Sequence, residues 1–315
     1  MDYDNDGILD FISGSYDPGD VYLFRGIGKG RYAAVEKILD KDGVPLVHHP
    51  EQLIAYEQMR KHGDESSDAA IRNRVASFGS WVAPVDWEND GDLDLLIGSF
   101  RGELFLRINE GSRNKPVYSP ESIPVPAGGI PLKVYCHADP VVADWNEDGL
   151  WDLVVSSGDG SVGWYENIGT ARSPRFGERQ LLVSAKSESK FLTQDLEPGE
   201  QPGPGVRAQI CVVDYDLDGH LDLVLGDYSN VRRLRVLDGG QRKERDATRV
   251  ALEEARSRLR AAGTDAKEHE ALQERVETLT KQEGTFYTEA EGRRTSHVWL
   301  YLRRPAHGGA PADKR

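Results

Sequence analysis

The phrase DYDNDGILDFISGSY occupies residues 2–16, and three related phrases follow it: DWENDGDLDLLIGSF at 86–100, DWNEDGLWDLVVSSG at 144–158 and DYDLDGHLDLVLGDY at 214–228. The first nine residues of each phrase follow the pattern Asp-x-Asp/Asn/Glu-x-Asp-Gly-x-x-Asp, and we number its positions 1 to 9. We call these segments acidic loops 1 to 4: residues 2–10, 86–94, 144–152 and 214–222. Self-similarity of this kind is typical of repeat architectures.

Short apolar runs surround each phrase. An apolar run precedes each of loops 2 to 4, at residues 81–85, 140–143 and 209–213. A segment of alternating apolar and polar residues follows each of the four loops, at residues 21–26, 103–109, 162–169 and 297–304. Such runs, bounded by Gly, Asp and Asn, indicate strands. About four strands per repeat is typical of a propeller blade. The sequence therefore predicts an all-β fold, a β-propeller of about four blades, whose first blade is incomplete because the chain opens inside its phrase.

The acidic loops have the ligand chemistry of calcium sites. Ca²⁺ takes about six to eight oxygen ligands, and carboxylate or amide oxygens at positions 1, 3, 5 and 9 with a backbone carbonyl at position 7 would supply them. Gly at position 6 permits the sharp turn around the ion. The expected ligands are Asp2, Asp4, Asp6, the Ile8 carbonyl and Asp10; Asp86, Glu88, Asp90, the Asp92 carbonyl and Asp94; Asp144, Asn146, Asp148, the Leu150 carbonyl and Asp152; and Asp214, Asp216, Asp218, the His220 carbonyl and Asp222.

The acidic loops have two alternative interpretations, as EF-hand loops or as turns that bind no ion. An EF-hand needs a bidentate Glu at its twelfth position, where this chain has Ser13, Ile97, Val155 and Leu225. Empty Asp/Gly turns remain an alternative for any single loop. Four copies with oxygen ligands in phase favour about four Ca²⁺ sites, with loops 2 and 3 as variants through Glu88 and Asn146.

The phrase, with the Leu-Leu/Val-x-Gly that follows position 9, resembles the FG-GAP and VCBS repeats. These repeats occur in the propellers of integrin α-subunits and in many secreted bacterial proteins. The resemblance covers most of residues 1–240 together with 285–304. It implies a propeller fold, calcium in the loops between strands and an extracytoplasmic location. It does not imply one function, because this fold hosts both binders and enzymes.

The last third of the chain departs from the repeat. Residues 241–283 predict an antiparallel helical hairpin, with helices over 246–262 and 266–282 joined at Gly263 and a capping box formed by Asp265 and Glu268. The expected organisation is propeller repeats over 1–240, the hairpin insertion over 241–283, returning strands of the last blade over 284–304, and a disordered tail over 305–315.

Charge and motifs exclude several function classes. A net charge of −14 disfavours nucleic acid as the main partner. We find no apolar run long enough to span a membrane, no signal peptide ahead of the first phrase, and no nucleophile elbow or phosphate loop. The adjacent His48 and His49 are interpreted as a solvated loop pair, with a ligand or base role as the less favoured alternative.

These observations favour a calcium-binding extracytoplasmic propeller that acts as a binding or scaffold module for a glycan or protein at the cell surface. Two alternatives stay open. One is a polysaccharide lyase or hydrolase built on a propeller, for which no catalytic residues can be chosen from the sequence. The other is a structural segment of a larger cell-surface protein, which the abrupt start of the chain would fit.

Overall fold

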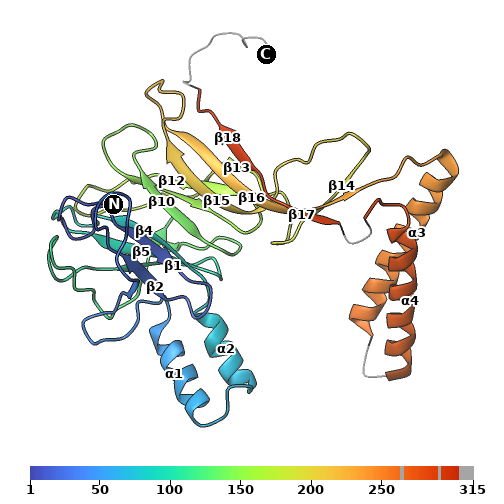
Figure 1. The fold of residues 1–315 in the computed structure, drawn as a ribbon, viewed down its shortest axis with the longest axis horizontal. Coiled ribbons are helices and arrows are strands. Elements are labelled where there is room, and N and C mark those ends of the chain that lie inside the picture. Colours follow the sequence, from blue (N-terminus) through green and yellow to red (C-terminus); the bar gives the residue numbers. More distant parts are fainter. Residues whose placement is uncertain (263–265, 290–291, 305–315) are drawn as a thin grey trace. The chain divides into compact units, whose positions relative to one another are not determined.

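A computed structural model describes residues 1–262, 266–289 and 292–304 (Figure 1). The chain forms two compact units. Unit 1 contains residues 1–190, 206–227 and 298–304, and unit 2 contains 191–205 and the described part of 228–297. The expected helix junction at Gly263, the capping box that involves Asp265 and the tail over 305–315 lie outside the described residues.

Unit 1 is built from four sheets whose strands run antiparallel to their neighbours. Sheet 1 contains β1 (Phe11–Gly14), β2 (Val21–Phe24) and β3 (Glu36–Lys37). Sheet 2 contains β4 (Ser80–Val85), β5 (Asp94–Ser99), β6 (Leu104–Arg107) and β7 (Ile123–Pro124). Sheet 3 contains β10 (Asp139–Ala143), β11 (Asp152–Ser156), β12 (Val162–Tyr165) and β13 (Gln180–Val183). Sheet 4 contains β15 (Val206–Val213), the first half of β16 (Asp222–Arg233) and β18 (Val298–Tyr301).

Each acidic loop leads into a strand in the same register: β1 in sheet 1, and the second strand in sheets 2, 3 and 4. Position 9 pairs with the residue just before position 1, as in Val85 with Asp94 and Ala143 with Asp152. In loop 1 the corresponding residues, Met1 and Asp10, are hydrogen-bonded through their backbones. The repeated phrase therefore corresponds to one repeated structural unit: loop, strand and following turn. The strand is buried throughout in sheets 2 and 3 and partly exposed in sheet 1. A minor hairpin of β8 (Pro126–Ala127) and β9 (Ile130–Pro131) lies between sheets 2 and 3 in the sequence.

Consecutive sheets are joined by equivalent backbone hydrogen bonds. The N–H of Gly79 donates to the Tyr16 carbonyl at 2.7 Å, that of His137 to Phe100 at 3.0 Å, and that of Arg207 to Gly158 at 3.0 Å. Tyr16, Phe100 and Gly158 hold the same place in their phrases. The three donors share a left-handed backbone, with φ of +65°, +51° and +54°. Two of them carry side chains in this sparsely populated conformation, so the junction geometry is kept even without glycine.

Apolar side chains fill the three spaces between consecutive sheets. Ile12 and Val21 of sheet 1 pack with Leu95 and Ile97 of sheet 2, in a cluster that Leu23, Ile38, Leu46 and Tyr118 extend. Corresponding clusters join sheet 2 to sheet 3 and sheet 3 to sheet 4. The prediction of a fold dominated by β-structure is therefore confirmed. The described residues do not show a closed ring of sheets.

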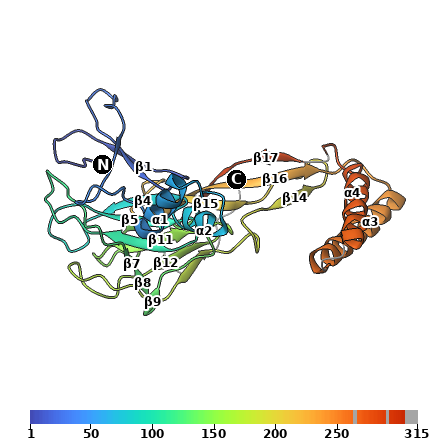
Figure 2. The same cartoon turned by 90° about the horizontal axis from the view of Figure 1, so that it is seen from below.

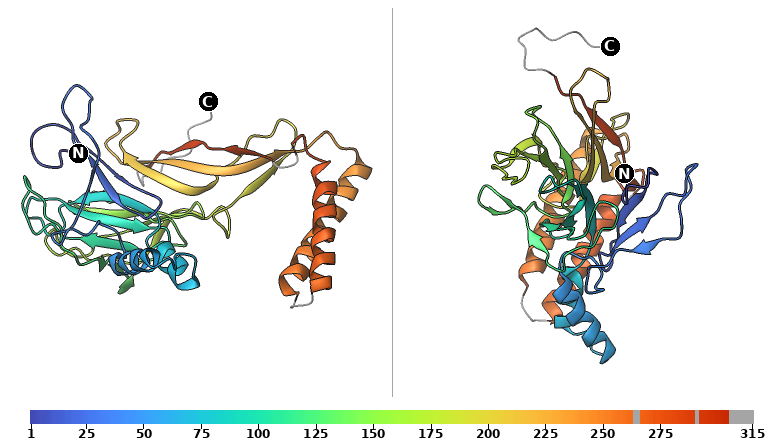
Figure 3. Two further views of the ribbon diagram at one scale, coloured as in Figure 1. Left: turned by 60° about the horizontal axis from the view of Figure 1, so that its bottom comes forward. Right: turned by 90° about the vertical axis from the view of Figure 1, so that its left-hand side faces the viewer.

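Two helices follow sheet 1 in the sequence: α1 (Pro50–Lys61) and α2 (Asp68–Ala76), which lie side by side in Figures 1 and 3. The second begins at a local cap, because the Ser67 hydroxyl accepts a hydrogen bond from the Ala70 N–H at 3.1 Å. No described helix of either unit has the length and apolarity needed to cross a lipid bilayer.

Unit 2 combines a short ladder with a helical hairpin. β14 (Thr193–Leu196) and β17 (Arg293–Thr295) flank the second half of β16, as Figure 2 shows. β14 lies in the 184–205 stretch, which reads as a plain loop in the sequence.

The hairpin consists of α3 (Gly239–Ala261) and α4 (Ala266–Gly284). α3 begins seven residues before the predicted 246, because the Asp238 carboxylate caps it by accepting hydrogen bonds from the Gly240 and Gln241 N–H groups at 2.8 and 2.9 Å. Leu252, Ala255 and Leu279 bury one another. The two apolar stripes of the hairpin therefore face each other.

Candidate functional site

The four acidic loops have the same internal hydrogen bonds. In loop 1 the two carboxylate oxygens of Asp2, at position 1, each accept a bond of 3.1 Å, from the Asp6 N–H and the Gly7 N–H. The equivalent distances are 2.9 and 3.1 Å at Asp86, 3.0 and 2.9 Å at Asp144, and 3.1 and 3.1 Å at Asp214. The carboxylate at position 5 accepts from the N–H at position 7 in every loop, at 2.8 to 3.0 Å.

The glycine at position 6 is required by conformation rather than by space. Its φ is +86°, +95°, +88° and +92° in loops 1 to 4, a region that L side chains rarely adopt. A Cβ built on any of these four glycines meets no atom within 4 Å. The residue at position 4 is also left-handed, with φ between +55° and +64° at Asn5, Asn89, Glu147 and Leu217.

The aspartate at position 9 joins each loop to the backbone just after the end of a later strand: β2, β6, β12 or β18. The buried Asp10 carboxylate accepts the Tyr3 N–H at 2.6 Å through one oxygen and the Gly26 N–H at 2.7 Å through the other. The corresponding pairs measure 2.9 and 2.7 Å at Asp94, 3.1 and 2.7 Å at Asp152, and 3.0 and 2.8 Å at Asp222. Each oxygen keeps a second lone pair, so it can also approach a cation.

Loops 1 and 4 bring carboxylates close together. Asp2, Asp4 and Asp10 offer oxygens that all lie within 4.8 Å of one another, and so do Asp214, Asp216 and Asp218. Loop 2 shows the same crowding as electrostatics: burial, followed by the charges of Asp90, Glu88 and Asp86, raises the pKa of Asp92 to about 6. Burial likewise raises the pKa of Asp94 to about 7. Negative charge is therefore concentrated in these loops at some electrostatic cost.

Two position-3 carboxylates have oxygens that would suit a bound cation. Asp4 Oδ1 and Glu88 Oε2 are buried and have no hydrogen-bond partner among the residues that the structure describes. A desolvated carboxylate oxygen without a partner is costly, and a hard cation with oxygen ligands would remove that cost. The donor set of each loop consists of oxygen atoms, which suits Ca²⁺ rather than a metal that prefers sulfur or imidazole.

Some cationic side chains of unit 1 already touch the loops. Arg25 forms an ion pair with Asp4 in loop 1. His220 of loop 4 lies 2.6 Å from the Glu147 carboxylate of loop 3, and Arg303 lies 3.1 Å from the same carboxylate. The Glu147 contact raises the pKa of His220, and the hydrogen bond from His220 lowers the pKa of Glu147. Loops 3 and 4 are thus linked directly, at positions outside the expected side-chain ligands.

Only some of the expected ligands within a loop have oxygens that lie within 4.8 Å of one another. The three-carboxylate groups of loops 1 and 4 do not include Asp6 or Asp222, respectively. The sequence analysis missed Asn109 and Asn167, whose N–H groups donate to Asp94 and Asp152. An asparagine fifteen residues after position 9 in loops 2 and 3 was the available signal.

The expectation of a solvated histidine pair is wrong for its first member. His48 is fully buried, with Nε2 placed 2.9 Å from the Ala76 carbonyl. Burial lowers the pKa of His48 to about 3, so the ring is neutral at physiological pH. His49 lies against Glu103, with 3.5 Å between Nε2 and the carboxylate. Both rings pack against Phe105, with His48 in the interior of unit 1 and His49 half-buried.

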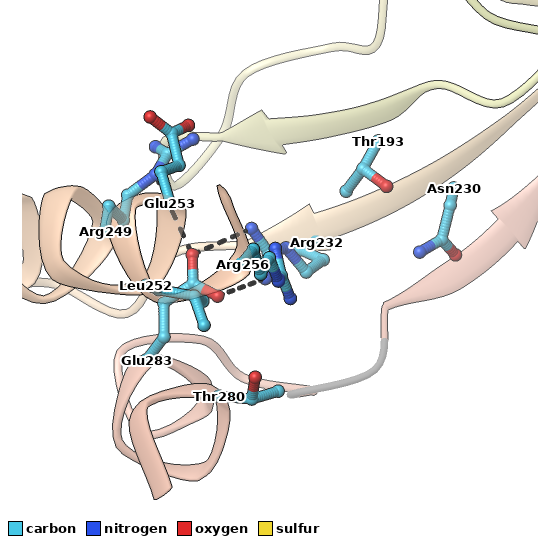
Figure 4. Close-up of a pocket in the computed structure, with 9 residues that line it drawn as sticks. All are labelled: Thr193, Asn230, Arg232, Arg249, Leu252, Glu253, Arg256, Thr280 and Glu283. Carbon is cyan, nitrogen blue, oxygen red and sulfur yellow. Dashed lines mark hydrogen bonds and ion pairs between the residues drawn. The ribbon is translucent and has the colours of Figure 1, made fainter. Parts of the chain in front are cut away.

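Unit 2 contains a different charged cluster, and Figure 4 shows three of its members, Arg232, Arg249 and Glu283. The Arg232 guanidinium binds Asp195 at 2.7 and 2.9 Å and Glu283 at 3.1 and 3.2 Å. Arg249 adds contacts of 3.3 Å to Asp195 and 3.7 Å to Glu283. Burial would lower the pKa of Arg232, but the hydrogen bonds to both carboxylates outweigh it and raise the pKa. A cavity beside this cluster is lined by Arg232, Arg249 and Glu283, which form the ion pairs given above, and also by Glu253 and Arg256.

Comparison with known proteins adds no relative: neither a scan against protein-family models nor a search of curated proteins finds a match for this chain.

Proposed function

We propose that the four sheets of unit 1 are blades of an FG-GAP/VCBS-type β-propeller that binds one Ca²⁺ in each acidic loop. The observation that supports this most strongly is the repetition of one hydrogen-bonded loop, with the same left-handed residues, in four sheets. Buried unpartnered oxygens on Asp4 and Glu88 point to a cation rather than to a self-sufficient turn.

The residues of each loop have separate tasks in this proposal. Position 1 organises the turn through two backbone N–H groups, and position 9 anchors it to a later strand. At position 3, Asp4 and Glu88 contribute buried oxygens, and the exposed aspartates at position 5 contribute further charge that the loop itself does not fully neutralise. The carbonyl of position 7 would complete the oxygen set. The hydrogen bond from the N–H of position 7 to the carboxylate of position 5 fixes the backbone there. Calcium would therefore act as a staple within each blade.

The proposed role of the whole chain is a binding or scaffold module outside the cytoplasm, with a glycan or protein as partner. Free calcium is abundant outside cells, where modules with affinities of roughly 10⁻⁴–10⁻³ M are occupied. The loops lie at one end of the strands, which leaves the opposite strand ends and the inserted segments for recognition.

Calcium titration tests this proposal. Protein stripped with EGTA and returned to chelator-free buffer should bind about four Ca²⁺ ions by isothermal titration calorimetry. Magnesium should compete weakly, because it prefers a smaller octahedral site. The matched control is a variant with Asp218→Asn and Asp216→Asn, which should lose one ion and keep its fold. Absence of calorimetric binding at millimolar Ca²⁺ would show that the loops are empty turns. A glycan array probed with and without EGTA then separates a sugar partner from a protein partner.

A further inference from the structure

The two end sheets of unit 1 each have one apolar face that no described residue covers well. On sheet 1, Phe11 is 53% exposed and lies beside Phe24, with 5.6 Å between ring centroids. We call Phe11 and Phe24 the first end face. On sheet 4, Val298 is 74% exposed and Leu300 is 42% exposed. We call Val298 and Leu300 the last end face.

Equivalent residues in the other sheets are buried. Leu95, Leu153 and Leu223 follow position 9 as Phe11 does, and their exposures are 0, 0 and 2%. Leu104 and Val162 hold the place of Val298, since each pairs with the thirteenth residue of its own phrase. Their exposures are 1 and 0%. The end faces are therefore the same surfaces that become interior wherever a neighbouring sheet is present.

The two end faces are complementary sides of one repeated interface. Leu95 packs toward the preceding sheet, in the cluster that contains Val21 and Leu23. Leu104 packs toward the following sheet, in the cluster that contains Leu153. The first end face is thus a surface that receives a preceding sheet, and the last end face is one that receives a following sheet. Contact between these two faces would reproduce a junction that the chain already makes three times.

We propose that a second copy of this chain covers both end faces, head to tail, in a two-fold ring of eight sheets. A heterologous contact of this kind either closes into a ring or continues as an open filament. Propellers typically contain about 4–8 blades. One copy has not closed on itself, because both end faces are exposed, and three copies would exceed that range. The inference rests on the proposed blade arrangement but not on calcium binding.

The mass of the protein in solution tests the ring. Sedimentation equilibrium of the full chain at micromolar concentration should give two copies of the 35.0 kDa polypeptide. The single variants Phe11→Glu and Leu300→Lys should each reduce the measured mass of the assembly to that of one polypeptide, while the circular dichroism spectrum stays unchanged. Ile130→Glu is the matched control, since Ile130 is an apolar residue of unit 1 with 69% exposure on the β8–β9 hairpin. That variant should keep the mass of wild type.

Mixing the two variants tests the head-to-tail geometry. A ring with one Phe11→Glu copy and one Leu300→Lys copy has one unaltered junction and one junction where the introduced carboxylate faces the introduced ammonium. The mixture should recover the mass of two copies. A one-copy mass for wild type, or a two-copy mass that survives both single variants, overturns the proposal. Failure of the mixture to recover overturns the head-to-tail arrangement. Titration of Ca²⁺ does not enter this test, so the two proposals can fail separately.

Discussion

The acidic loops of unit 1 and the Arg232 cluster of unit 2 accommodate concentrated carboxylates in opposite ways. In unit 2, Arg232 and Arg249 neutralise Asp195 and Glu283 within the chain. In unit 1, Asp4 and Glu88 retain buried oxygens without a hydrogen-bond partner. If the acidic loops bind calcium as proposed, the cluster of unit 2 depends on the chain alone, and the loops depend also on an ion supplied by the solvent. The stability of the two units should therefore respond to different treatments.

Calcium removal should give the largest difference between the units. A ligand that binds only the folded state at 100 times its Kd stabilises it by about 2.7 kcal/mol per site. The proposal gives unit 1 about four such sites and unit 2 none. In differential scanning calorimetry, EGTA should lower the melting temperature of unit 1 by many degrees and leave that of unit 2 unchanged. Added Ca²⁺ should reverse the change. Equal shifts in both transitions would contradict the separation.

Arg232→Met should produce the converse result. Removal of one partner from a buried ion pair costs about 3–5 kcal/mol, because the remaining charges are left unpaired. Asp195 and Glu283 would keep only the longer contacts to Arg249, so the melting temperature of unit 2 should fall whether or not Ca²⁺ is present. Arg242→Met is the control, since Arg242 pairs with Glu197 at an exposed site. Equal effects of the two variants would show that the cluster contributes little.

Asp152→Ala and Asp148→Ala should separate the framework of a loop from its ion. Asp152 accepts two backbone N–H groups from Trp145 and Asn167, and each hydrogen bond to a charged group contributes about 1.5–3 kcal/mol. Its loss should therefore destabilise unit 1 even in EGTA. Asp148 is exposed, and its removal should matter in Ca²⁺ and have little effect in EGTA. Thermal melts of both variants in both buffers provide the measurement.

Asn146→Asp should have the smallest effect and sharpen the comparison among the loops. An added carboxylate at position 3 raises the ligand charge of loop 3 to that of loops 1 and 4, and ligand charge tunes calcium affinity. We expect one site to tighten several-fold in calorimetric titration, with a slightly lower melting temperature in EGTA from repulsion with Asp144 and Asp148. Unchanged affinity would place the bound ion away from Asn146.

The acidic loops could be predicted from sequence because their determinants are local. Position 1 binds residues four and five places away, and the left-handed glycine at position 6 is part of the same nine residues. The Arg232 cluster could not be predicted, since its partners Asp195 and Glu283 lie 37 and 51 residues away. The junctions between sheets were missed for a related reason. They depend on the left-handed backbone of His137 and Arg207, a conformation that neither residue type favours.

The position-9 aspartates have a kinetic consequence. Each holds its loop to two backbone N–H groups from different parts of the chain, so the loop keeps its shape before any ion arrives. An ion that enters such a preorganised ring of oxygens orders little further chain, and binding then costs little conformational entropy. Association should be limited by how fast Ca²⁺ sheds its water. In the proposed sites the protein would therefore follow a rise or fall of calcium quickly, without refolding at each change.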